Sequence, residues 1–277
     1  MTVLTNDGKL QLEGNHISHS VPQLNEWKQV INVADAKISM VKRLVNESKY
    51  LVCICGGGML RESGHLSLRD PERAYDIEAR YGYSPEEMFS SAFYNTRTES
   101  FYRFYKEDIL SEKIEPGAAF FSLAKLEEQG ILKTIITNNI YAMPKHAGCK
   151  NVLEPHGNIE KNKCPHCGRE YTKEYLMNAK KVPLCESCVK TIRPGIRFFG
   201  EQIDNGLMTQ VANEISKSDV LMILGTRLDS EFCDNYVSYY EGDKLILINN
   251  IENFTDEKAD YVIHGVINEI LPQLIEE

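Results

Sequence analysis

Long apolar runs are missing from this sequence. No stretch approaches the ~20 consecutive apolar residues that a membrane-spanning helix requires, and MTVLTNDGKLQLEGNHISHS at positions 1–20 holds no apolar segment typical of a secretory signal. A run of lysine or arginine is also missing, and the net charge is −9, so the protein's field repels phosphate backbones. These absences argue against a membrane protein and a nucleic-acid partner, and they predict a cytoplasmic location.

Low-complexity tracts and internal repeats are absent as well. Hydrophobic residues make up 42% of the chain and charged residues 26%, which is typical of a globular protein. The chain has 277 residues, and domains cluster near ~100–200 residues. We therefore expect one large core with a smaller unit beside it.

Short apolar runs predict the strands of a sheet. They alternate with helical stretches, a pattern typical of a parallel sheet with helices on both faces. The predicted fold class is therefore α/β, a doubly wound, Rossmann-like parallel sheet. The runs are YLVCIC (50–55), LKTIIT (132–137), VLMILG (220–225), KLILIN (244–249) and ADYVIHG (259–265), and a helix is predicted over 23–48.

Two insertions interrupt this pattern. A helical one spans about 70–112, and its aromatic stripe of Phe101, Phe104 and Tyr105 is more typical of a core than of a base-stacking surface. The second, about 157–195, contains closely spaced cysteines. Together they predict a small zinc-binding and helical lobe, with the ligand cleft between the lobes.

Four cysteines carry the clearest metal signal. They form C-x2-C, a gap of 17 residues, and C-x2-C, which is the spacing of two zinc knuckles. Disulfides are the alternative, but a cytosolic location disfavours them. Four thiolates fill a tetrahedral zinc site, so the zinc would be structural. The predicted ligands are Cys164, Cys167, Cys185 and Cys188.

The first strand ends in three glycines, Gly56, Gly57 and Gly58. A glycine turn between a strand and a helix lets the backbone approach a pyrophosphate closely. The third glycine of G-x-G-x-x-G is missing here, because Arg61 takes that place. A plain tight turn is therefore an equally good interpretation of this feature by itself.

The ordered motifs resemble the sirtuin family of NAD-dependent protein deacylases over about residues 34–277, with 1–33 as an N-terminal extension. GGGMLRESG corresponds to the family's glycine-rich NAD loop, TNNIYAMPKHAG to its T-Q-N-I-D-x-L-H-x-x-A-G segment, and EPHG to E-L-H-G. The zinc knuckles follow, and then RPGIRFFGE for R-P-x-V-V-W-F-G-E, GTR for G-T-S and LINN for the strand that ends in asparagine.

The resemblance implies roles for particular residues. His156 would be the general base that takes a proton from a ribose hydroxyl after an acyl-lysine oxygen displaces nicotinamide, with Asn139 as a positioner. Without the resemblance, a structural role for His156 is the simpler interpretation. The implied NAD-binding residues are Gly56, Gly57, Gly58, Arg69, Asn138, Asn139, Gly225, Thr226, Arg227 and Asn249. The implied acyl-lysine-binding residues are Ile196, Arg197, Phe198, Phe199 and Gly200.

Departures from the family pattern fall on the cofactor site. Ser67 and Tyr141 stand where the family has carboxylates, and the one at Tyr141 normally contacts the nicotinamide carboxamide. Arg227 replaces a serine and either reaches a phosphate or lies in solvent. Arg197 replaces an apolar residue, and we predict that it pairs with an acidic acyl group or an acidic partner residue, with exposure to solvent as the alternative.

Three functions fit these observations. The first is a zinc-stapled NAD-dependent deacylase that acts on acyl-lysine in a protein. The second keeps the NAD pocket but transfers ADP-ribose to a protein acceptor or hydrolyses NAD. The third is a module that binds NAD, ADP-ribose or a peptide without turnover, which the loss of two pocket carboxylates would permit.

Overall fold

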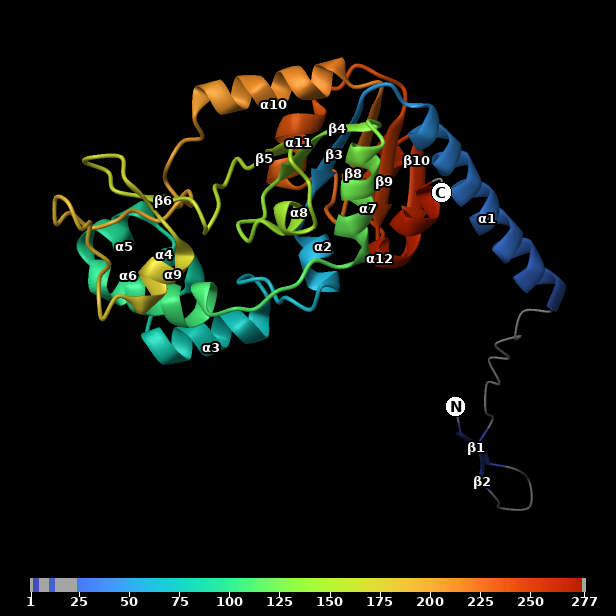
Figure 1. Ribbon diagram of the computed structural model, residues 1–277. Helices are drawn as coiled ribbons and strands as arrows, with labels where there is room; N and C mark the ends of the chain where they lie inside the picture. Colours follow the sequence, from blue (N-terminus) through green and yellow to red (C-terminus); the bar gives the residue numbers. More distant parts are fainter. Residues whose placement is uncertain (1, 5–9, 13–23, 276–277) are drawn as a thin grey trace. The chain divides into compact units, whose positions relative to one another are not determined.

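The predicted strands form one parallel sheet in the computed structural model, which describes residues 2–4, 10–12 and 24–275 (Figure 1). Its order is β10-β9-β8-β3-β4-β5, and every pair is parallel. The strands are β3 (Leu51–Cys55), β4 (Leu132–Thr137), β5 (Val152–Leu153), β8 (Val220–Leu224), β9 (Leu245–Asn249) and β10 (Tyr261–His264). The doubly wound α/β prediction is confirmed, and β5 is a short addition that the apolar pattern did not indicate.

Alternate residues of each strand enter two separate cores, as the period of two in a strand requires. Cys53, Met222 and Ile248 pack with α1 (Leu24–Glu47), α7 (Ala118–Glu128) and α12 (Ile267–Ile270). On the other face, Ile54 and Ile223 pack with α10 (Asn205–Lys217) and α11 (Glu231–Val237). Because both faces are buried, each of these strands reads as a continuous apolar run.

The helical insertion between β3 and β4 builds the second lobe. It contains α3 (Pro71–Tyr81), α4 (Pro85–Met88), α5 (Ser91–Thr96), α6 (Thr98–Phe104) and the π-helix η1 (Tyr105–Leu110). Phe101, Phe104 and Tyr105 are fully buried, which confirms a core role for the aromatic stripe. Phe198, which follows the cysteine segment, packs edge-on against Phe101 with ring centroids 5.2 Å apart.

The remaining elements are short. They are α2 (Gly57–Glu62), α8 (Met143–His146), β6 (Asn162–Lys163), β7 (Glu170–Tyr171), α9 (Lys173–Asn178), η2 (Phe254–Lys258) and η3 (Leu271–Leu274). No helix in the described part of the chain is long and apolar enough to span a membrane.

The chain divides into two compact units, Met1–Ala36 and Lys37–Glu277. The first contains a hairpin of β1 (Thr2–Leu4) and β2 (Leu10–Leu12) and the start of α1. The extension predicted for 1–33 lies partly outside the described residues. The sheet and both insertions belong to the second unit.

Candidate functional site

The glycine turn after β3 packs directly on the turn after β8. The Gly58 N–H donates to the carbonyl of Gly225 at 2.7 Å, and a Cβ added to Gly58 would lie 2.7–3.0 Å from three backbone atoms of Gly225. Gly225 itself has φ +64, where side chains are strained. Gly57 has nothing within 4 Å of an added Cβ, so it faces open space. The carboxyl ends of the two central strands thus form one narrow backbone surface.

Two further predicted NAD residues lie on the loop after β8. The hydroxyl of Thr226 lies 3.0 Å from that of Ser230, which caps α11 by accepting from the Cys233 N–H. Arg227 is more than half exposed and pairs with Asp229 at 2.9 Å. Its guanidinium therefore has a carboxylate partner already, and a phosphate contact would compete with that pair.

Asn249 is the last residue of β9, and Asn139 follows the end of β4 by two residues; both are buried. The Asn249 side chain turns back on its own loop, where Nδ2 donates to the carbonyl of Ile251 at 3.2 Å. Asn139 accepts the N–H of Tyr141 at its Oδ1, at 2.7 Å. Among the described residues its buried Nδ2 has no hydrogen-bond partner. A buried amide donor without a partner is costly unless a ligand accepts from it, which fits a bound NAD molecule.

His156 lies close to Asn138 and to two arginines. Its pKa is lowered from 6.5 to about 4, although the backbone of Asn138 beside the ring acts to raise it. Burial is the main cause, followed by the charge of Arg197, and Arg69 adds to it, while Glu231 acts in the opposite direction. The imidazole is therefore neutral at pH 7 and able to accept a proton.

The segment predicted to bind acyl-lysine runs beside His156. The Arg197 N–H donates to the His156 carbonyl at 2.9 Å, next to the bridge between Gly157 and Ile196. Further along, the Phe199 N–H donates to the Phe89 carbonyl at 2.9 Å. The segment is therefore hydrogen-bonded to His156 at one end and to the helical lobe at the other. Within it, Phe198 is buried and Phe199 is 49% exposed. Gly200 follows with φ +87.

The sulfurs of Cys164, Cys167, Cys185 and Cys188 all lie within 4.8 Å of one another. Four sulfurs bound to one zinc at 2.3 Å would be about 3.8 Å apart, so the cluster fits a tetrahedral structural site. The model of the Sir2 family matches residues 56–231. This chain belongs to the Sir2 family.

Relatives of known name match most of the length of this chain. It is 36% identical over 240 residues to the NAD-dependent protein deacetylase of Clostridium acetobutylicum, with 86% of this chain and 98% of the relative covered. The protein of the same name from Thermotoga maritima is 32% identical over 240 residues, with 84% and 95% covered.

Solved Sir2 structures share the fold. One described as "Sir2-p53 peptide-NAD+" matches with a TM-score of 0.71 and 29% identity, over 86% of this chain and 96% of that one. Another, described as "The Structural basis of Sirtuin Substrate Affinity", gives 0.75 and 30% over 92% and 98%. The predicted resemblance is confirmed.

A buried polar cluster lies around Tyr141, the position of one departure from the family pattern. Tyr141 is 5% exposed, and its ring meets that of His65 edge-on at 4.7 Å. His65 Nδ1 lies 2.5 Å from a Glu112 carboxylate oxygen, and Arg73 binds the same carboxylate. Burial, followed by the Glu112 charge, raises the pKa of the Tyr141 hydroxyl. These polar groups lie next to the tyrosine, but among the described residues its buried hydroxyl has no hydrogen-bond partner.

Sequence reasoning missed His65, and it gave no role to Arg73 or Glu112. The one available signal was the place of His65, directly after Gly64 at the end of the glycine-rich motif. Its partner Glu112 comes from the far end of the helical insertion, so no local spacing links the two. Ser67, at the other departure, accepts the Arg69 N–H at 3.2 Å and shapes the same loop.

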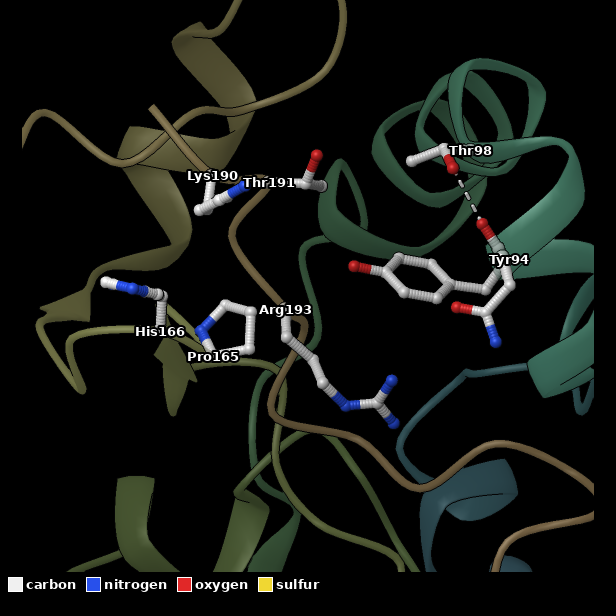
Figure 2. Close-up of a pocket in the computed structure, with 8 residues that line it drawn as sticks. Tyr94, Thr98, Pro165, His166, Lys190, Thr191 and Arg193 are labelled. Atoms are coloured by element: carbon white, nitrogen blue, oxygen red, sulfur yellow. Dashed lines mark hydrogen bonds between the residues drawn. The ribbon is translucent and has the colours of Figure 1, made fainter. Parts of the chain in front are cut away.

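A separate groove of about 530 Å³ lies between the helical insertion and the cysteine segment (Figure 2). Tyr94 and Thr98 line one side, and His166, Lys190 and Arg193 the other. It contains none of the predicted NAD or acyl-lysine residues. We therefore assign it no part in the site built around His156.

Proposed function

We propose that this protein is an NAD-dependent protein-lysine deacylase of sirtuin type. The observation that carries the proposal is the half-buried His156, whose lowered pKa keeps it neutral, close to Asn138 and to Asn139, whose Nδ2 has no hydrogen-bond partner among the described residues. A base and a free amide donor thus lie close together after the end of β4. The relatives named NAD-dependent protein deacetylase support the same activity.

Most of the residues that we assign to NAD lie at the carboxyl ends of β3, β4, β8 and β9. NAD would supply the ribose carbon that accepts the acyl oxygen, while nicotinamide leaves with the electron pair of the glycosidic bond. On the protein side, the glycine turn offers close backbone approach, and Asn139 offers a free donor. The proposed NAD-binding set is Gly56, Gly57, Gly58, Arg69, Asn138, Asn139, Gly225, Thr226, Arg227 and Asn249.

His156 would act as the general base. Its neutral imidazole would take the proton of a ribose hydroxyl, which could then attack the carbon of the bound acyl group. Ile196 to Gly200 would hold the acyl-lysine, because this segment bonds the His156 carbonyl at one end and the helical lobe at the other. Zinc at the four cysteines would staple the lobe and take no part in chemistry, since four thiolates leave no open position.

Residues 34–277 would form the catalytic unit, with the protein substrate bound between the lobes. We also propose a cytoplasmic location, because a four-cysteine zinc cluster needs its thiols reduced and a cytosol keeps them so.

Nicotinamide release from NAD, measured by chromatography with and without acyl-lysine peptides, tests the proposal. Release that requires both peptide and His156 is expected, and His156→Ala should retain zinc and helical circular dichroism while losing release. Release without peptide would instead favour NAD hydrolysis or ADP-ribose transfer. No release from zinc-loaded protein would leave a binding module as the better account.

A further inference from the structure

Arg197 is a half-buried cation without a carboxylate partner among the described residues. Its one side-chain hydrogen bond goes from Nη1 to the backbone carbonyl of Glu201, at 2.8 Å. The Glu201 carboxylate cannot neutralise it, because both of its oxygens accept from Arg193 at 2.7 Å and one also accepts the Phe198 N–H. The guanidinium therefore keeps N–H donors for which the described residues provide no acceptor.

A second arginine, Arg69, also has no carboxylate partner among the described residues and acts on the same histidine. Arg69 is exposed, and its guanidinium sits 5.9 Å from the ring centre of Phe199, which is itself half exposed. Both arginines act on His156 electrostatically, so both lie near the base. The carboxylate of Glu231 acts on the same ring in the opposite direction. The surroundings of the base are therefore net positive in a chain of net charge −9.

An anion bound to Arg197 would lie close to His156 and therefore close to the reacting acyl carbon. Arg197 is not on the loops after β3 or β8, where a diphosphate would meet the glycine turns; it lies on the segment that pairs with Gly157 and His156. An acyl group held beside His156 would extend past the base toward Arg197. A carboxylate at the end of that group would meet a planar guanidinium with free N–H donors, which is a favourable charged hydrogen-bonding geometry.

We propose that Arg197 binds the terminal carboxylate of a dicarboxylic acyl group on lysine, of the succinyl or glutaryl class, with Arg69 adding positive charge at the mouth. This inference rests on the proposed deacylase function and names its substrate class. The proposed reaction stays balanced with this substrate. The acyl group moves from the lysine nitrogen to a ribose oxygen, and nicotinamide leaves the ribose carbon. One water molecule supplies the remaining oxygen of the acylated ribose product and the proton that the lysine amine gains. Arg197 binds the carboxylate of the acyl group and itself exchanges no bond or proton in this reaction.

Four peptides that differ in one acyl group test the inference. They carry acetyl-, butyryl-, succinyl- and succinamoyl-lysine; the last matches succinyl in size but ends in a neutral amide. Wild-type protein should use succinyl-lysine with a kcat/KM at least tenfold above succinamoyl-lysine. Arg197→Gln should bring that ratio within about twofold of one. Arg197→Lys should keep part of the preference for succinyl-lysine, because lysine keeps the positive charge but cannot donate two parallel hydrogen bonds to one carboxylate.

The control variant is Arg103→Ala, which removes a positive charge from the exposed face of α6, where Arg103 faces Glu107 at 3.7 Å. It should leave the succinyl to succinamoyl ratio at the wild-type value. A merely structural role for Arg197 would change the rates on both peptides together and leave their ratio intact. An equal ratio in the wild type and Arg197→Gln overturns the inference.

A failure of the proposed deacylase function can be told apart from a failure of the Arg197 inference. If no peptide releases nicotinamide, the deacylase proposal fails, and the dissociation constants of the same fluorescent peptides then decide the inference. Tighter binding of succinyl- than of succinamoyl-lysine, lost in Arg197→Gln, supports carboxylate recognition without turnover. Equal binding of the two peptides to the wild type refutes it.

Discussion

Alanine at Gly58 should destabilise the protein, whereas alanine at Gly57 should not. The two glycines are adjacent in the same turn, and neither requires a positive φ. They differ in what an added Cβ would meet: at Gly58 it would lie 2.7 Å from the carbonyl oxygen and 2.8 Å from the Cα of Gly225, and at Gly57 it would meet nothing within 4 Å. The opposing atoms are backbone, so no side chain can rotate away.

The size of the difference follows from two opposing effects. Overpacking against backbone costs about 1–3 kcal/mol, because the strands that carry the two turns must shift. Replacing a glycine at the start of α2 gains about 0.5–1 kcal/mol, mainly by restricting the unfolded chain. Gly57→Ala receives only the gain, and Gly58→Ala receives both. The two variants should therefore differ by about 1–3 kcal/mol in their free energies of unfolding.

Urea unfolding followed by circular dichroism measures this difference. Fluorescence is a poor probe here, because the chain's one tryptophan is Trp27, in the unit Met1–Ala36 and not in the unit with the sheet. Gly57→Ala should unfold at or slightly above the wild-type urea concentration, and Gly58→Ala well below it. Equal midpoints for the two variants would show that the close approach of the β3 and β8 turns is not a constraint on stability.

Three further predictions concern charge and metal. Zinc analysis should find one ion per chain, and Cys164→Ser should lose it with a fall in thermal midpoint, because the thiolate is a ligand in a closed site. Burial raises the pKa of Glu154, but its bonds from Lys145 and Lys161 lower it more; both lysines are partly exposed, so Glu154→Gln should cost about 2 kcal/mol at pH 7, the size of a hydrogen bond to a charged group. The loss should shrink as pH falls through the lowered pKa, and a pH-independent loss would contradict the ion pairs. On the acid side, kcat/KM should fall as the pH drops through the pKa of His156, near pH 4 in the free enzyme. Arg197→Gln should move this fall to higher pH, because it removes a positive charge that lowers the pKa. An unchanged pH profile would show that Arg197 does not lower the pKa of His156.

The sheet could be predicted because its signals are local. Each of the central strands is a continuous apolar run bounded by turns, and β4 begins and ends where LKTIIT does. The cysteine cluster was equally accessible, since the spacing within each C-x2-C pair already limits how its two thiols can lie. The aromatic stripe at Phe101 was assigned to the core on the same kind of helical spacing, and it is fully buried.

The polar cluster at Tyr141 could not be predicted, because its members come from four separate stretches of chain. His65 ends the glycine loop, Arg73 lies on α3, Glu112 follows η1 and Tyr141 follows β4. Only the packed fold brings them together. The sequence shows a lost carboxylate at position 141, but it does not show that Glu112 supplies another carboxylate nearby.

The charge state of His156 depends on the fold in the same way, and this has a consequence for the reaction. Burial and the charges of two arginines lower the pKa of the ring, and the backbone N–H of Arg197 donates to the His156 carbonyl. An anion bound to Arg197 would offset one of the charges that depress the pKa of His156. The imidazole would then become a stronger base only when such a substrate is in place. Substrate choice and base strength would thus be set by one guanidinium, so a dicarboxylic acyl group would raise the rate of proton transfer as well as the affinity.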